Sequence, residues 1–114
     1  LQSLALLNAP QYTEAAHGLA QRMIKVGDEL DGQIEHGFRL ATARQPSSKE
    51  LELLKSSYGE QVDYFGESPD KRDGYLRYGR APLAEMNDDQ KNKTAALTAV
   101  AALILNLDET ITRE

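Results

Sequence analysis

The sequence predicts an all-α fold, a compact bundle of five or six helices around an apolar C-terminal helix. Alternating strand patterns are nearly absent, and apolar residues instead recur every three or four positions along most of the chain. The stretch Ala95–Leu107 is apolar nearly all round, so as a helix it must be covered by the other helices. Its longest strictly apolar run, Ala99–Leu105, is far shorter than the roughly 20 residues that span a bilayer.

Length and composition fit a single helical domain over residues 1–114. Hydrophobic residues make up 40% of the chain and charged residues 27%, as in ordinary globular domains. The chain begins at Leu1, inside an apolar stretch and without a charged leader, so we expect a C-terminal fragment of a longer protein. The formal net charge of −5 disfavours nucleic-acid binding. The absence of cysteine excludes disulfides, thiolate-bound metals and covalent haem attachment.

The first half of the chain predicts three helices. Residues 1–8 form a short apolar helix, and Pro10 suits the first turn of the next one. Gly27 ends that second helix, and Asp28 is expected to cap the third. The apolar stripes of the second and third helices consist of Tyr12, Ala15, Ala16, Leu19, Ala20 and Met23, and of Leu30, Ile34, Gly37, Phe38 and Ala41.

The second half contains the clearest helix starts. Ser47 and Glu50 form a capping-box pattern after Pro46, and the helix that follows carries one apolar face toward the core. The core face consists of Leu51, Leu54, Tyr58, Val62 and Phe65. Leu53 and Tyr64 lie on the opposite face of the helix, eleven residues apart and nearly in line, which indicates a second contact. A short helix is then expected from Ser68-Pro69 to Tyr78, and Gly79 ends it. Residues 80–86 are expected to form a loop. Asn87, with Gln90 three residues later, is expected to begin the last helix.

The titratable residues form no recognisable catalytic or metal-binding pattern. His17 and His36 both lie off the apolar stripes of their helices, so we expect solvated surface histidines. Neither has a histidine or acidic residue placed to form an obvious metal pair, apart from Glu35 beside His36, which points elsewhere on the helix. The carboxylates are plentiful but scattered over helix starts and exposed faces. We therefore expect no metal and no cofactor in this chain, and whether the protein is an enzyme stays open.

One basic stretch is interleaved with aromatic residues. Tyr75, Arg77, Tyr78 and Arg80 are candidate contacts for an anion, a carbohydrate or a partner protein. The alternative is a short amphipathic helix that buries Leu76 and one tyrosine while its arginines stay in solvent. Leu53 and Tyr64 are the other candidate partner contacts.

The C-terminal helix runs directly into Asn106, Asp108 and Glu109. We interpret these as a buried polar cluster that completes the helix end by hydrogen bonding to backbone groups, with Arg39 or Arg44 as ion-pair partners of the acids. The alternative is a site in which the three polar residues and an arginine face a pocket shared with another domain.

Three blocks of the sequence resemble the C-terminal domain of a planctomycete protein family. They are "LQSLALLNAP" (residues 1–10), "FRLATARQP" (residues 38–46) and "LNLDETITRE" (residues 105–114), and the likeness extends over essentially the whole chain. Members are large exported proteins that often carry a cytochrome-c-type domain nearer the N-terminus, and no catalytic residues can be carried over from them.

The resemblance implies a context more than a mechanism. It implies an extracytoplasmic protein, periplasmic or secreted, in which this chain packs against upstream domains of the same polypeptide. The favoured hypothesis is a non-catalytic helical packing and interaction module. The alternatives are a contribution to an active site shared with upstream domains, or binding of carbohydrate or anions. We expect no nucleic acid and no membrane span, and oligomerisation stays open.

Overall fold

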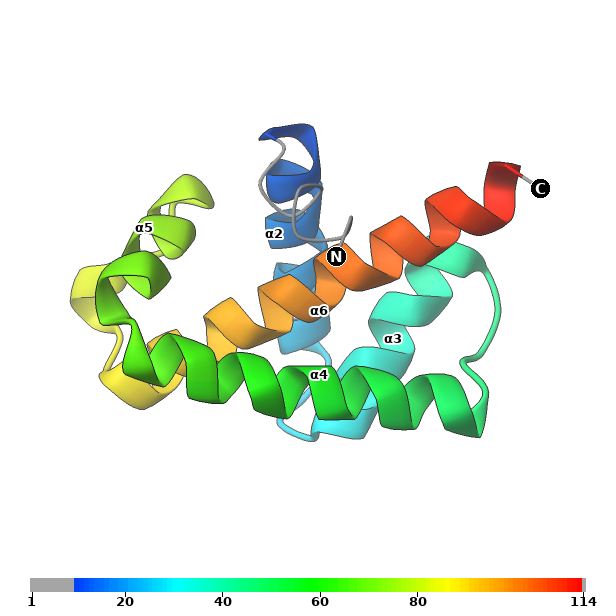
Figure 1. The fold of residues 1–114 in the computed structure, drawn as a ribbon, viewed down its shortest axis with the longest axis horizontal. Helices are drawn as coiled ribbons and strands as arrows, with labels where there is room; N and C mark the ends of the chain where they lie inside the picture. The colour runs from blue at the N-terminus through cyan, green and yellow to red at the C-terminus, as the bar shows by residue number, and fades with distance from the viewer. Residues whose placement is uncertain (1–9, 114) are drawn as a thin grey trace.

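The computed structural model describes the backbone of residues 10–113 and the side chains of residues 14–107. This part of the chain contains five α-helices, one short 3-10 helix and no strand (Figure 1), so the predicted all-α bundle is confirmed. The expected helix over residues 1–8 lies outside the described residues. The helices are α2 (Pro10–Lys25), α3 (Leu30–Thr42), α4 (Ser48–Glu67), α5 (Pro69–Tyr78), the 3-10 helix η1 (Leu83–Glu85) and α6 (Asp88–Arg113).

The C-terminal helix α6 is the centre of the bundle. It contacts α2, α3, α4 and α5, and α4 runs along the whole length of one side of the molecule (Figure 1). Every residue from Ala95 to Ala102 is buried, and so is Ile104. Five of these residues are alanines, whose small side chains let four other helices approach one helix closely. The prediction of a covered apolar helix is confirmed.

The core has two parts along α6. The larger part joins α2, α3 and α4 to the middle of α6, with Met23, Phe38 and Leu54 among its fully buried side chains. The smaller part lies toward the start of α6, where Phe65 of α4 and Leu76 of α5 pack on Ala95 and Ala99. Among the stripe residues whose side chains are described, all but the exposed Ala15 are buried or partly buried, and the Tyr12 side chain lies outside the described residues.

Both predicted capping patterns are present. The Ser47 hydroxyl accepts a hydrogen bond from the Glu50 amide, and the Glu50 carboxylate accepts one from the Ser47 amide. Asn87 and Gln90 make the same reciprocal pair at the start of α6, at 2.8 and 2.9 Å. These local bonds satisfy amide groups that have no partner inside the helix, and they fix where α4 and α6 begin.

The predicted cap at Asp28 is wrong. Helix α3 begins at Leu30 with Glu29 in the N-cap position, and no side chain caps it. The connection is held instead by Gln33, whose amide donates to the Gly27 carbonyl at 2.7 Å. Gly27 has a φ of 151°, a conformation that residues with a side chain rarely adopt, and this glycine therefore shapes the turn.

The central position of α6 predicts unequal costs for two neighbouring truncations. Ile104 is fully buried, whereas Leu103 is partly exposed. We expect Ile104→Ala to lower the free energy of unfolding by about 2–5 kcal/mol and Leu103→Ala to cost less. Urea denaturation of the two variants checks this. A midpoint for Ile104→Ala close to that of the unchanged protein would contradict the central placement of α6.

Candidate functional site

The candidate contacts on α5 do not form one surface. Arg77, Tyr78 and Arg80 are exposed at the C-terminal end of the helix, and the Tyr78 side chain is 59% exposed. Tyr75 instead turns inward, where burial raises the pKa of its phenol to about 12. Helix α5 therefore buries Leu76 and one tyrosine, as the amphipathic alternative predicted.

The prediction that the arginines of this helix stay in solvent is wrong for Arg72. Its side chain is only 5% exposed. The guanidinium donates to Asp73 at 2.8 Å, to Asn92 at 2.9 Å and to Asp88 at 3.3 Å. The bond from Arg72 holds the pKa of the Asp73 carboxyl below its usual range. Because Asp88 and Asn92 belong to the first turns of α6, this network ties α5 to the start of the central helix.

Four aromatic rings form a continuous row across α4, α5 and α2. The rings of Tyr64 and Phe65 meet edge to face with centroids 5.1 Å apart, and Phe65 stacks on Tyr75 at 5.6 Å. Tyr75 in turn contacts His17 at 5.1 Å. We call these four residues the aromatic row. It runs from the half-exposed Tyr64 to the buried His17, so it links one of the predicted partner contacts to the interior.

The prediction of a solvated His17 is wrong, because the residue is only 7% exposed. Its Nε2 atom is buried and has no hydrogen-bond partner among the described residues, and the same holds for the Tyr75 hydroxyl. The imidazole bonds to the Tyr75 backbone carbonyl, which leaves Nδ1 as the donor. Burial lowers the pKa of His17, and this effect outweighs the opposing effect of the backbone bond. The spacing of His17, Ala20 and Ile24 at i, i+3 and i+7 is the helical signal that could have placed it inward.

Gly79 explains how His17 fits against the end of α5. A Cβ atom at Gly79 would overlap the imidazole ring at Nδ1 and Cγ. The Gly79 amide donates to the carbonyls of Leu76 and Arg77 rather than to that of Tyr75. The Tyr75 carbonyl is thus left for the imidazole, and His17 completes the C-terminal end of α5 from the neighbouring helix.

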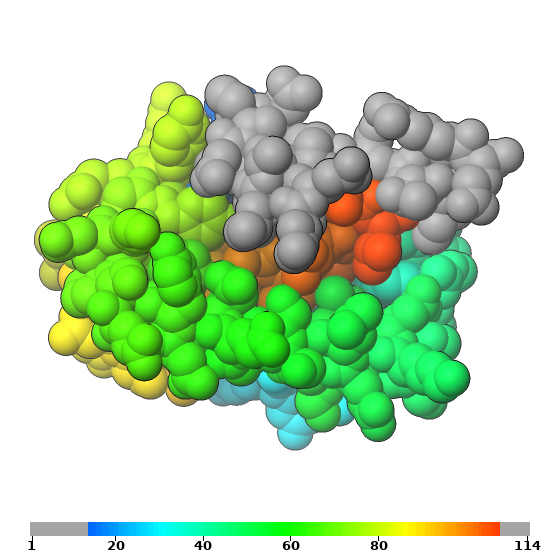
Figure 2. All heavy atoms as spheres, viewed as in Figure 1, coloured from blue at the N-terminus to red at the C-terminus, as the bar shows by residue number. Residues whose placement is uncertain are grey.

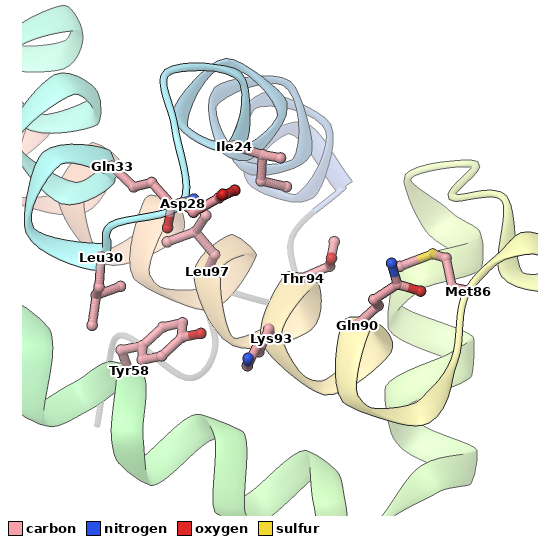
Figure 3. A pocket seen from close by; sticks show the side chains of 10 residues that line it. All are labelled: Ile24, Asp28, Leu30, Gln33, Tyr58, Met86, Gln90, Lys93, Thr94 and Leu97. Carbon is pink, nitrogen blue, oxygen red and sulfur yellow. The ribbon is translucent and has the colours of Figure 1, made fainter.

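A half-open cleft of about 580 Å³ lies between the α2–α3 connection, α4 and α6 (Figure 3). Much of its polar lining is already engaged in structural bonds. Gln33 bonds to Gly27, Gln90 caps α6, and Lys93 pairs with Asp89 at 3.0 Å. The cleft has the volume of a ligand site, and half of its six polar side chains, those of Gln33, Gln90 and Lys93, are held in these structural contacts.

Of the predicted C-terminal polar cluster, only the Asn106 side chain lies among the described residues. Asn106 is half-buried and has an interaction partner. The side chains of Asp108 and Glu109 lie outside the described residues. Arg44, one of the two expected partners of these acids, forms two hydrogen bonds with the Glu50 carboxylate, both at 2.9 Å. The pKa of Glu50 is lowered to about 2, mainly by the hydrogen bond from Arg44 and next by the bond from the Ser47 amide.

The second apolar face of α4 is exposed as predicted. Leu53 is 66% exposed and Tyr64 is 44% exposed, and atoms of α4 form the lower part of the face shown in Figure 2. Among the described side chains, those of residues 14–107, no three from His, Asp or Glu stand close enough to hold a metal ion. Within residues 10–113, no helix is both long and apolar enough to cross a membrane.

The architecture defines the chain as a helical-bundle protein of the all-α class. A sequence model of the PSD1 family, described as proteins of unknown function (DUF1553), matches residues 1–58. The chain belongs to this family. Neither the curated proteins nor the solved structures contain a match.

The fit between His17 and Gly79 predicts opposite effects for two glycine substitutions in and beside α5. We expect Gly79→Ala to lower the free energy of unfolding by about 1–3 kcal/mol, because the new methyl group overlaps a rigid ring. Gly74→Ala is the matched control, since a Cβ atom there meets nothing within 4 Å. It should raise the free energy by about 0.5–1 kcal/mol through the helix propensity of alanine.

Thermal or urea denaturation measures both changes. Combining Gly79→Ala with His17→Ala should remove part of the cost of the glycine substitution, because the overlapping ring is gone. Equal effects of the two glycine substitutions would show that His17 does not pack on Gly79 in solution.

Proposed function

We propose that this chain is a non-catalytic helical packing and interaction module of a large exported planctomycete protein. Its partner is an upstream domain of the same polypeptide, and the setting is extracytoplasmic. The sequence resemblance supports this context, and membership of a family of unknown function is compatible with it. The chain itself carries no cofactor in this proposal.

The outward face of α4 is the observation that carries the proposal. Leu53 and Tyr64 are both large, apolar and exposed, while the opposite face of the same helix contributes Leu54 and Phe65 to the core. The two exposed side chains are eleven residues apart, about 16 Å along the helix, and they lie within a few tens of degrees of one line. Single exposed apolar residues are ordinary. The alignment of these two on the outward face of a helix whose other face packs inward is what favours a second interface.

Charge narrows the chemistry of the partner surface. Glu60 lies between Leu53 and Tyr64 on the outward face, and Asp63 and Glu67 border it, all three exposed. The helix region over residues 47–67 has a net charge of −3. A complementary partner therefore presents apolar side chains flanked by lysine or arginine.

Cysteine labelling tests this proposal, because the chain has no cysteine of its own. Leu53→Cys and Tyr64→Cys are introduced separately, both in this chain alone and in the longer polypeptide. We expect fast maleimide modification in the isolated chain and at least tenfold slower modification in the longer polypeptide, where the partner domain covers the face. Mass spectrometry of the labelled peptides gives the rates.

Glu52→Cys is the matched control. Residue 52 is exposed and adjacent to Leu53, but it points about 100° away around the helix. Its modification rate should be similar in both settings. Equal rates at position 53 in the isolated chain and in the longer polypeptide would overturn the proposal.

A second candidate function is the binding of carbohydrate or anions at the end of α5. Arg77, Tyr78 and Arg80 are exposed there, and arginine with an aromatic ring suits sulfated or hydroxyl-rich ligands. Titration with sulfated oligosaccharides, followed by NMR, should shift the signals of these three residues. Unmoved signals would remove this candidate.

The remaining alternative is an active site shared with an upstream domain, built on Asn106, Asp108 and Glu109. Only Asn106 has a described side chain, and it already has an interaction partner. The proposed interface on α4 is therefore better supported than the shared active site.

A further inference from the structure

The contact between His17 and α5 joins two helices that otherwise touch little. Helix α5 packs mainly on α6, α4 and η1. Among the described side chains, the imidazole of His17 connects α5 to α2: it lies on Gly79, contacts the Tyr75 ring and bonds to the Tyr75 carbonyl. A titratable side chain therefore takes part in the docking of the α5 end on α2.

We propose that His17 is a pH-sensitive switch whose protonation releases the C-terminal end of α5 from α2. The imidazole fits this place as a neutral group. A proton on Nε2 would place a positive charge and a new donor at a buried atom that has no acceptor among the described residues. Separation of α5 from α2 brings that atom into water, where the charged form is stable.

The groups that face His17 do not offset this charge. From α5 the titratable neighbour is Tyr75, whose phenol is neutral over the physiological range, and burial raises its pKa further, to about 12. On α2 itself, Glu14 lies one turn before His17 and is exposed. Among the described residues no carboxylate forms an ion pair with His17. The Tyr75 carbonyl accepts a hydrogen bond from the imidazole, but the neutral imidazole already makes this bond.

The sign of the pH response follows from these contacts. Burial holds the pKa of His17 in the docked arrangement below its usual value of 6.5, whereas the released side chain titrates near 6.5. Docking is therefore unaffected by pH above about 6.5 and weakens as the pH falls from there to the lower pKa. Over that interval the released population rises by up to about tenfold per pH unit.

Release would uncover apolar surface at one end of the bundle. Phe65 and Tyr75 stack on each other inside the aromatic row, and Leu76 packs with Ala95 and Ala99. Movement of the α5 end separates members of this cluster. Mild acid would therefore expose an aromatic surface beside Tyr64, one of the partner contacts on α4. The switch itself does not depend on the proposed function, because it requires no partner.

Native-state hydrogen exchange between pH 7.5 and 5 tests the proposal. We expect the amides at the end of α5 to exchange through an opening that is more frequent than global unfolding and depends little on urea. This opening should become more frequent with acid after correction for the chemical exchange rate. Exchange of α5 only at the global rate set by Ala95–Ala102, at every pH, would overturn the proposal.

Two variants separate His17 from other acid effects. His17→Gln keeps a donor for the Tyr75 carbonyl but cannot become charged, so its α5 opening should lose the pH dependence. His36→Gln removes the other histidine, on α3, and should keep the response of the unchanged protein. A pH dependence of the same size in His17→Gln would overturn the assignment to His17.

An NMR titration covers the case in which the His17 variant fails to fold. The imidazole signals of the unchanged protein give the His17 pKa directly. We expect a value below 6.5 and a midpoint that coincides with the increase in α5 opening. A pKa at or above 6.5 would show that the docked site accepts the charged form, and the proposal would fail.

Discussion

The burial of one alanine-rich helix on all sides is the constraint on which the rest of the fold depends. The middle of α6 has no exposed face, so each of the other four described α-helices must supply an apolar surface to it. Alanine makes this geometry possible, because small side chains allow close approach of several helices while larger ones such as Val100 and Ile104 fill the remaining space. The capping bonds then fix the residues at which α4 and α6 begin.

The two parts of the core use different chemistry. Around the middle of α6, packing is almost wholly apolar and involves α2, α3 and α4. At the α5 end, the apolar cluster is small, and a buried arginine, stacked rings and a histidine complete the contact. Directional contacts of this kind depend on protonation and on single atoms. The α5 end is therefore the part of the bundle in which local opening and regulation are to be expected.

Local signals made much of the fold predictable. The capping pairs Ser47–Glu50 and Asn87–Gln90 are short-range patterns, and the structure contains both. The exposed pair on α4 followed from helical angles alone. His17 and Arg72 were not predicted to be buried, because their polar groups are accommodated by residues from other helices: a carbonyl at the end of α5 for His17, and the first turns of α6 for Arg72. Spacing within one helix can indicate which way a side chain points, as for His17, but it does not identify the groups on other helices that accept its hydrogen bonds. The inward position of Tyr75, away from exposed Arg77 and Tyr78, likewise depends on contacts with other helices.

The central claim is that α6 is the structural centre of the bundle, and amide hydrogen exchange tests it most directly. If the claim holds, the amides of Ala95–Ala102 exchange more slowly than all others in the chain, at the free energy of global unfolding. Slower exchange in α2 or α3 than in α6, or exchange of α6 through an opening that leaves the other helices intact, would contradict it.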